Sequence, residues 1–289
     1  MAFNLSNLNT YVEENKLPLI AASVLKGNTV SKFSLMTGVK GSAALNIIST
    51  NPTLQEGDCA FTPVGDTKFT QRVVNTYQFK VNMEWCEKDL LAYYTQYAVR
   101  AGLADDSLAF EEYITKQIVD NVQAQIENEI WKGGMMTGIN PILRSDGAKR
   151  VSFSAGTSAY EAVKEVYMAI PEKVLDKAVI FCGMDTFRQY TMELAEKNLY
   201  HYSADGAGLE IVIPATNTKL VAVAGLNGTQ VIVAGAPDNF YFATDMLSDA
   251  ETFDIWYSKD NRTYRLAIEF NAGVQVAFPD EVVLGQFMD

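Results

Sequence analysis

An apolar stripe between Leu108 and Lys132 constrains the fold of this chain more than any other feature. Branched apolar residues recur there at every fourth position, at Ile114, Ile118, Val122, Ile126 and Ile130. At about 100° per residue such a stripe drifts by about 40° at each step, so the apolar face spirals around the helix. Ser107 or Asp106 is a suitable N-cap, and Gly133-Gly134 ends the helix because glycine accepts positive φ at little cost. We predict one long helix that packs along a curved or twisted sheet.

The segment before this helix has the pattern of β-structure. Strict alternation with polar residues predicts a half-buried strand whose apolar face carries Tyr77, Phe79, Val81, Met83 and Trp85. Before it, Cys59–Val64 and Thr67–Val73 are expected to form a long hairpin that turns at Gly65-Asp66. The flanks of this hairpin, Thr50–Gly57 and Thr67–Thr76, are polar, so it has little reason to fold back onto its own core. We expect it to reach toward a neighbouring molecule.

The middle of the chain, Val151–Asp245, has α/β character. The spacing of Ser158 and Glu161 is that of a capping box at the start of a helix. The run Lys177–Cys182 predicts a buried strand, and Asp185 is a suitable cap for a helix over Thr186–Asn198. Short apolar strands follow between Gly and Asn-Gly turns, at Leu209–Ile213, Leu220–Ala224, Val231–Ala234 and, as a further candidate, Phe240–Ala243.

The two ends of the chain frame this block. Residues 1 to about 40 contain only marginal helices, too short to be stable alone, and are expected to form an arm that needs a partner surface. The last forty residues return to antiparallel β-structure, with strands expected at Phe253–Tyr257, Tyr264–Phe270 and Val274–Phe278. The α/β block therefore lies between two halves of a body made of β-structure and the long helix.

Charge and hydropathy exclude some classes of protein. The 289 residues include 35 acidic and 23 basic side chains, for a formal charge of −12. A chain this acidic is a poor candidate for gripping nucleic acid, which is bound through cationic contacts to phosphate. Acidity of this degree is equally common in ordinary soluble proteins, so the charge alone indicates no particular function. No apolar run approaches the roughly 20 residues of a membrane helix, and the first residues lack the pattern of a secretory signal, so we expect folding in a cytoplasm.

Catalytic and metal-binding motifs are weak. The one histidine, His201, lies in a turn-like stretch, and no serine stands in a G-x-S-x-G context, so a catalytic triad is not indicated. The cysteines Cys59, Cys86 and Cys182 form no C-x-x-C pair and are expected to be reduced. Gly206-Ala-Gly208 lacks the third glycine of a dinucleotide loop. We predict no enzymatic activity, no cofactor and no metal.

Three runs of sequence stand out: WKGGMMTGINPIL after the long helix, KAVIFCGMDTFRQYTMELAEKNLYHY in the α/β block, and FDIWYSKDNRTYRLAIEFNAGVQVAFPDEVV near the end. They resemble passages of one known family, the major capsid proteins of tailed bacteriophages, which have the Hong Kong ninety-seven fold. The first run departs from the family pattern, because Met135 stands where an acidic residue is commoner and Pro141 follows Gly138-Ile139 instead of preceding it. The order of elements along nearly the whole chain is also similar to that of the family.

The resemblance implies an α+β fold with named parts. These are an N-terminal arm at 1–42, an extended β-hairpin loop at 43–80, a peripheral domain with a β-sheet and the spine helix at 81–137 and 246–289, and an α/β axial domain at 138–245. It implies a structural protein that assembles with itself in hexamers and pentamers into an icosahedral shell around double-stranded phage DNA. The expected partners are a portal and a separate scaffolding protein, with no membrane, and the expected location is the virion, after assembly in the cytoplasm of the bacterial host.

Two alternatives stay open at this stage. One is the shell of an encapsulin, a cellular compartment for a cargo enzyme with the same fold. The other is a soluble α/β enzyme or ligand-binding protein that uses Val151–Asp245, for which the sequence offers no site motif.

The expected inter-subunit contacts follow from the predicted hairpin, arm and terminal turn. They are Phe61, Lys68, Phe69, Arg72, Tyr11 and Asn261. The resemblance raises a lysine–asparagine cross-link between subunits, for which Lys68 and Asn261 have the right residue types, but non-covalent contacts are favoured.

Overall fold

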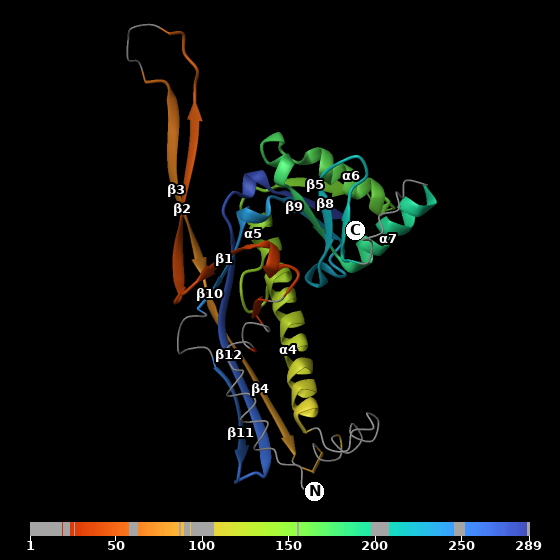
Figure 1. The fold of residues 1–289 in the computed structure, drawn as a ribbon. Helices are drawn as coiled ribbons and strands as arrows, with labels where there is room; N and C mark the ends of the chain where they lie inside the picture. The colour runs from red at the N-terminus through yellow and green to blue at the C-terminus, as the bar shows by residue number, and fades with distance from the viewer. Residues whose placement is uncertain are drawn as a thin grey trace.

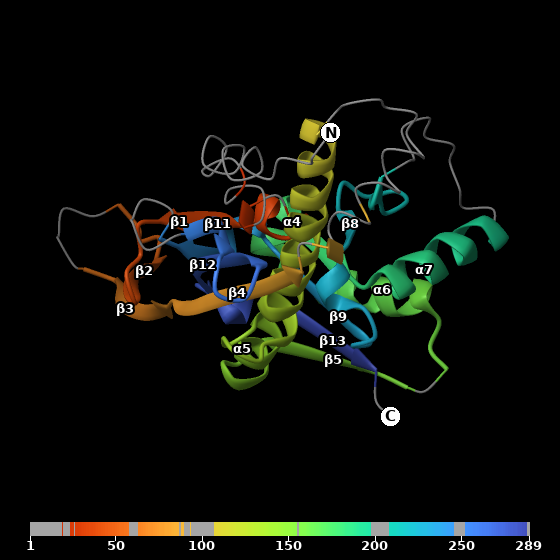
Figure 2. The same cartoon turned by 90° about the horizontal axis from the view of Figure 1, so that it is seen from below.

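In a computed structural model, a long helix lies between two sheets, and a two-stranded hairpin stands away from both (Figure 1). The helix is α4 (Ser107–Lys132), which confirms the helix predicted from the four-residue repeat. Figure 2 shows α4 with one sheet on each side. The structure describes residues 19, 24–25, 27–57, 63–86, 88–89, 93, 107–154, 156–197, 208–245 and 252–287, with the backbone alone for 107–113 and 252.

The five-stranded sheet is built around β12, the long strand near the end of the chain. Its members are β1 (Ser34–Thr37), β4 (Tyr77–Cys86), β10 (Phe240–Thr244), β11 (Thr252–Ser258) and β12 (Thr263–Val276). β12 pairs antiparallel with β4, β10 and β11, and β1 runs parallel to β10. The strand predicted from strict alternation is therefore confirmed as β4, and its apolar face turns toward α4, where Phe79 is buried.

The six-stranded sheet carries the remaining helices. Its order is β5-β13-β9-β6-β8-β7, from β5 (Lys149–Phe153), β6 (Val179–Cys182), β7 (Glu210–Val212), β8 (Lys219–Ala222), β9 (Val231–Gly235) and β13 (Val283–Phe287). Helices α6 (Ala159–Ala169) and α7 (Met184–Glu196) lie along it, and the short helix α5 (Ile139–Ser145) follows the turn after α4. The buried strand predicted at Lys177–Cys182 is confirmed as β6.

The C-terminal strands differ from the prediction. β10 belongs to the five-stranded sheet and not to the α/β block, and β12 is one continuous strand where a break after Phe270 was expected. β13 was not predicted, and it pairs with β5 and β9 in the other sheet. Pairing between distant segments decides these memberships, and a local pattern does not contain that information.

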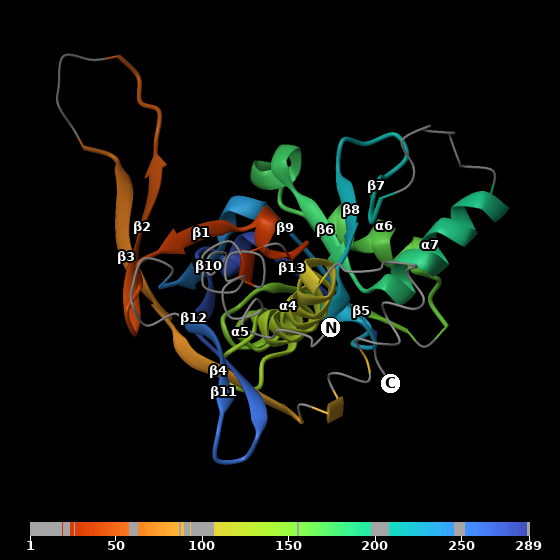
Figure 3. The same ribbon diagram turned by 60° about the horizontal axis from the view of Figure 1, so that its bottom comes forward.

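The hairpin is also paired differently from the prediction. Its strands are β2 (Ser42–Pro52) and β3 (Gly65–Asn75), with residues 53–64 as the connection. The expected turn at Gly65-Asp66 is wrong, because Gly65 opens β3 with φ 120° and pairs with Pro52. The outer part of the hairpin stands apart from the body in both views (Figures 1 and 3).

The starts of α6 and α7 were both predicted from the sequence, and the two predictions had different outcomes. The predicted cap of α6 is confirmed, since Ser158 Oγ accepts a hydrogen bond of 3.2 Å from Glu161 N. At α7 the prediction was wrong: the helix starts earlier, at Met184, whose N–H donates to Asn227 Oδ1 at 2.6 Å. Asp185, the expected cap, is the second residue of the helix: its Oδ1 accepts from Thr186 N at 2.8 Å and its Oδ2 accepts from Gly228 N at 3.1 Å. Hydrogen bonds at Met184 and Asp185 therefore tie α7 to the turn before β9.

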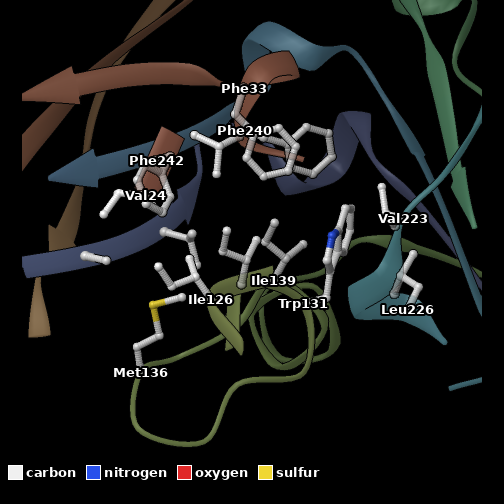
Figure 4. Packing of buried hydrophobic residues seen from close by; sticks show 14 of the residues in the cluster. Val24, Phe33, Ile126, Trp131, Met136, Ile139, Val223, Leu226, Phe240 and Phe242 are labelled. Carbon is white, nitrogen blue, oxygen red and sulfur yellow. The ribbon is translucent and has the colours of Figure 1, made fainter. Parts of the chain in front are cut away.

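The largest core cluster surrounds the C-terminal half of α4 and joins both sheets. Figure 4 shows Trp131 beneath Phe33 and Phe240, with Leu226 beside it. The Phe33 ring lies 5.9 Å from the Trp131 ring and stacks on Phe240 at 5.1 Å. Val24, Val30 and Phe33 are all buried in this cluster, so the partner surface expected for the N-terminal segment is, for these residues, the body of the same chain.

Some predicted elements fall outside the described residues. These are the first marginal helix, expected around Tyr11, and the turn-like stretch expected around His201.

Candidate assembly surface

One face of the hairpin, which we call the apolar face, exposes two cross-strand pairs of apolar side chains, with the hydrogen-bonded pair Asn46 and Gln71 between them. Register places Ile48 directly opposite Phe69, and Ala44 opposite Val73, all on the same face because side chains alternate along each strand. The exposed fractions are 60% for Ile48, 76% for Phe69 and 47% for Val73. Burying one such side chain contributes about 1.5–3 kcal/mol, so this face is a strong candidate for contact with another protein surface.

The opposite face of the hairpin is buried only near its base. Leu45, Ile47 and Val74 are buried, while the residues of both strands farther out are exposed. Val74 and Leu45 cluster with Val39 and Ala243, which joins the base of the hairpin to β10. The outer part of the hairpin therefore lacks a core of its own.

The structure separates the residues predicted to make inter-subunit contacts. Phe69 lies on the exposed apolar face, whereas Lys68 lies on the opposite face of β3, with its Nζ 3.8 Å from Asp66 Oδ2. The turn between β11 and β12, which holds the exposed Asn261, lies at the far end of the molecule from the hairpin (Figure 1). Lys68 and Asn261 of one chain are therefore not brought together. Phe61 and Tyr11 lie outside the described residues.

Arg72 is engaged within its own chain. Its Nη2 forms an ion pair with Asp146 Oδ2 and donates to Gln275 Oε1 at 3.2 Å. The pKa of Asp146 is lowered, first by the hydrogen bond from the Ser145 hydroxyl and then by Arg72. Sequence reasoning did not single out Asp146 or Gln275, because only the fold brings their elements to the base of the hairpin.

A second polar junction is buried where the N-terminal segment crosses α4. Glu127 Oε1 accepts from Thr29 N at 3.2 Å, and Trp131 Nε1 donates to Thr29 Oγ1 at 2.9 Å. Burial raises the pKa of Glu127, against the opposing effect of hydrogen bonds from the backbone N–H groups of Thr29, Ala224 and Asn28. This junction fixes the segment before β1 and the turn at Ala224–Leu226 on the same part of α4.

Three findings in the described residues concern metal binding, cysteine reactivity and membrane spans. Within them, no group of three or more His, Cys, Asp and Glu side chains is placed to hold a metal ion. Cys182 is buried, which raises the pKa of its thiol and disfavours the reactive thiolate. No helix in the described part of the chain is both long enough and apolar enough to span a bilayer.

Solved structures with the same arrangement of elements are capsids and related particles. A procapsid of satellite phage P4 that includes a size determination protein matches with a TM-score of 0.62 and 12% identity, over 94% of this chain and 91% of the other. The chain has the fold of a phage capsid protein. The capsid of an empty GTA particle matches as well, with a TM-score of 0.59 and 11% identity, over 93% of this chain and 90% of the other.

A virus-like particle from Pyrococcus furiosus shares the capsid fold as well. Its TM-score is 0.56 at 12% identity, over 94% of this chain and 98% of that one. No family model matches the chain, and no curated protein matches its sequence. At these identities the shared property is the fold, and it confirms the α+β capsid fold that the resemblance in the sequence implied.

Proposed function

We propose that this chain is the major capsid protein of a tailed phage and assembles with itself into an icosahedral shell around double-stranded DNA. The observation that carries the proposal is the exposed apolar face of a hairpin that projects from a body with the capsid fold. An exposed phenylalanine side chain does not stabilise an isolated molecule in water, and Phe69 lies in the middle of β3 with most of its surface exposed. A second copy of the chain supplies a surface that buries it, and repeated contacts of this kind build a shell.

The parts of the molecule have matching roles in this proposal. The hairpin is the extended loop expected at 43–80, although β2 already begins at Ser42. The chain before it, expected at 1–42, is the arm, whose strand β1 joins the five-stranded sheet. The five-stranded sheet with α4 is the peripheral domain, and the six-stranded sheet with α6 and α7 is the axial domain that meets its copies in hexamers and pentamers. β13 pairs in the six-stranded sheet, so the end of the chain also contributes to the axial part.

The remaining partners belong to the same proposal. We assign a portal and a separate scaffolding protein as partners, the virion as location, and the host cytoplasm as the place of assembly. The formal charge of −12 supports enclosure of DNA without specific binding. The role in this proposal is structural and not enzymatic.

The test uses a charge on the apolar face and the same charge on the other face. Phe69→Asp places a carboxylate where a second copy would bury a phenyl ring, and Thr70→Asp places it one residue along, on the opposite side of β3. We expect Phe69→Asp to remain a folded monomer by circular dichroism and light scattering, while Thr70→Asp still assembles. Normal shells from Phe69→Asp would contradict the role of this face.

A cellular cargo compartment is the second candidate, and the match to the Pyrococcus furiosus particle is the observation that favours it. The contents of shells purified from the native source separate the two functions. Packaged DNA supports the phage capsid, and a co-purifying enzyme with no DNA supports the compartment.

A further inference from the structure

The hairpin joins the body through a narrow base. On the β2 side the connection contains Gly38 and Gly41, both with positive φ, at 74° and 81°. On the β3 side the connection is Thr76, whose N–H donates to Gly41 O at 2.8 Å. At eleven residues per strand the hairpin is about 36 Å long, so a rotation of about 10° at the base moves its far end by about 6 Å.

Side-chain and backbone packing holds the base of the hairpin, but few contacts fix the angle between the hairpin and the body. Gly273 of β12 approaches the backbone so closely that an added Cβ would lie 2.1 Å from Asn75 O. Beyond this point, buried hairpin side chains are limited to Leu45, Ile47 and Val74 among the described residues. Polar contacts at Arg72 are the ones that connect β3 to two other elements at once.

Arg72 reaches two partners that are themselves held in place. Asp146 lies at the end of α5, where its N–H donates to Ile142 O at 3.0 Å and its Oδ1 accepts from Ser145 Oγ at 2.7 Å. Gln275 of β12 donates from Nε2 to Val73 O at 2.8 Å and accepts from Val276 N at 3.0 Å. The guanidinium of Arg72 thus connects the hairpin to α5 and to β12 through side chains that their own hydrogen bonds already orient.

We propose that Arg72, Asp146 and Gln275 form a latch that fixes the direction of the β2–β3 hairpin relative to the body. Arg72 is then a positioning residue that acts within its own chain. The latch rests on the proposed function in one respect: the direction matters because the apolar face must meet a second copy at a set angle. The Arg72 and Asp146 side chains keep 23% and 33% of their surfaces exposed and lie outside the hydrophobic core clusters, so we expect the body to stay folded when the latch is released.

Spin labels on the hairpin and the body measure this direction in the isolated molecule. One label replaces Thr67 on β3 and the other replaces Lys164 on α6, both exposed, in a chain with Cys59→Ser and Cys86→Ser and with the buried Cys182 kept. Pulsed electron resonance then gives the distribution of distances between the labels. The variants are Arg72→Ala, Asp146→Asn, and the exchange of charges in Arg72→Asp with Asp146→Arg.

Lys68→Ala is the matched control for the loss of a cation. Lys68 is on the same face of β3 as Arg72, and the ion pair recorded for it is with Asp66 of its own strand. We expect a narrow distribution of label distances for the wild type and for Lys68→Ala. We expect a broader distribution for Arg72→Ala and for Asp146→Asn. The variant with exchanged charges, Arg72→Asp with Asp146→Arg, should again give a narrow distribution. Equal widths for the wild type and Arg72→Ala would overturn the latch.

Shell formation by the same variants is measured separately. Fewer or misshapen shells from Arg72→Ala support the link between hairpin direction and assembly, and a wild-type yield of normal shells from a variant with a broadened distribution overturns that link. A wild-type chain with a narrow distribution that forms no shell under any condition would contradict the proposed function and leave the latch standing.

Discussion

Glu127 is an acidic side chain at a place where a charge is costly. It is buried between the N-terminal segment, α4 and the turn at Ala224–Leu226, and it compensates by accepting backbone hydrogen bonds. Burial dominates, so its pKa is raised. A raised carboxyl pKa means that folding favours the protonated form, and this contribution to stability is lost as pH rises from the ordinary glutamate value through the folded value.

The pH dependence of one variant isolates this residue. Glu127→Gln removes the titration and keeps the side-chain volume. As pH rises from mildly acidic to neutral, we expect the wild type to lose stability relative to Glu127→Gln, because only the wild type must ionise a buried group. Urea unfolding of both proteins across this range measures the difference. A difference that stays constant, or that changes in favour of the wild type, would contradict the raised pKa.

The buried indole N–H of Trp131 donates its hydrogen bond to the hydroxyl of Thr29. Thr29→Val keeps the shape of the side chain but leaves the buried Trp131 Nε1 without its acceptor. We expect the free energy of unfolding to fall by about 1–3 kcal/mol, the cost of a buried unsatisfied donor. Ser31→Ala, which removes an exposed hydroxyl that donates to Asn28 O, is the control and should change stability little. Similar stability of Thr29→Val and the control would show that the indole finds another partner.

Helices and strands whose pattern is carried by neighbouring residues could be predicted from the sequence, and the pairing of distant strands could not. α4 and β4 were predicted correctly because their periodicity is carried by neighbouring residues. The hairpin was expected, but its register was not, since the pairing of Ile48 with Phe69 spans a connection of twelve residues with no turn motif. The apolar face therefore could not be read from the sequence, although Phe69 itself was predicted as a contact.

The turn after α4 gives a test of an element boundary. Gly133 has φ 75°, and an added Cβ would lie 2.8 Å from Gly138 N. Gly147 also has positive φ, at 85°, but nothing lies within 4 Å of an added Cβ. Both alanine variants should lose about 1–2 kcal/mol from the backbone conformation, and Gly133→Ala should lose more because of the close contact. Thermal or urea unfolding of the pair measures this; equal losses would argue against a tight turn.

For the whole molecule, the resemblance in sequence predicted the fold but not the contacts between distant segments. The order of arm, hairpin, helix, α/β block and β return pointed to the capsid fold, which the solved structures confirm. The contact partners of Arg72, the crossing of β13 into the second sheet and the junction at Glu127 depend on contacts between segments far apart in sequence. The candidate site was therefore predicted at the level of the element and only in part at the level of the residue.

Electron microscopy of the purified chain, matched with size-exclusion light scattering, tests the central claim most directly. We expect closed shells, or open sheets and tubes of the same lattice, with rings of five or six copies as the repeating unit. A protein that stays monomeric by light scattering at high concentration, with crowding agents, and in the presence of a co-expressed scaffolding protein would contradict the claim that this chain builds a capsid.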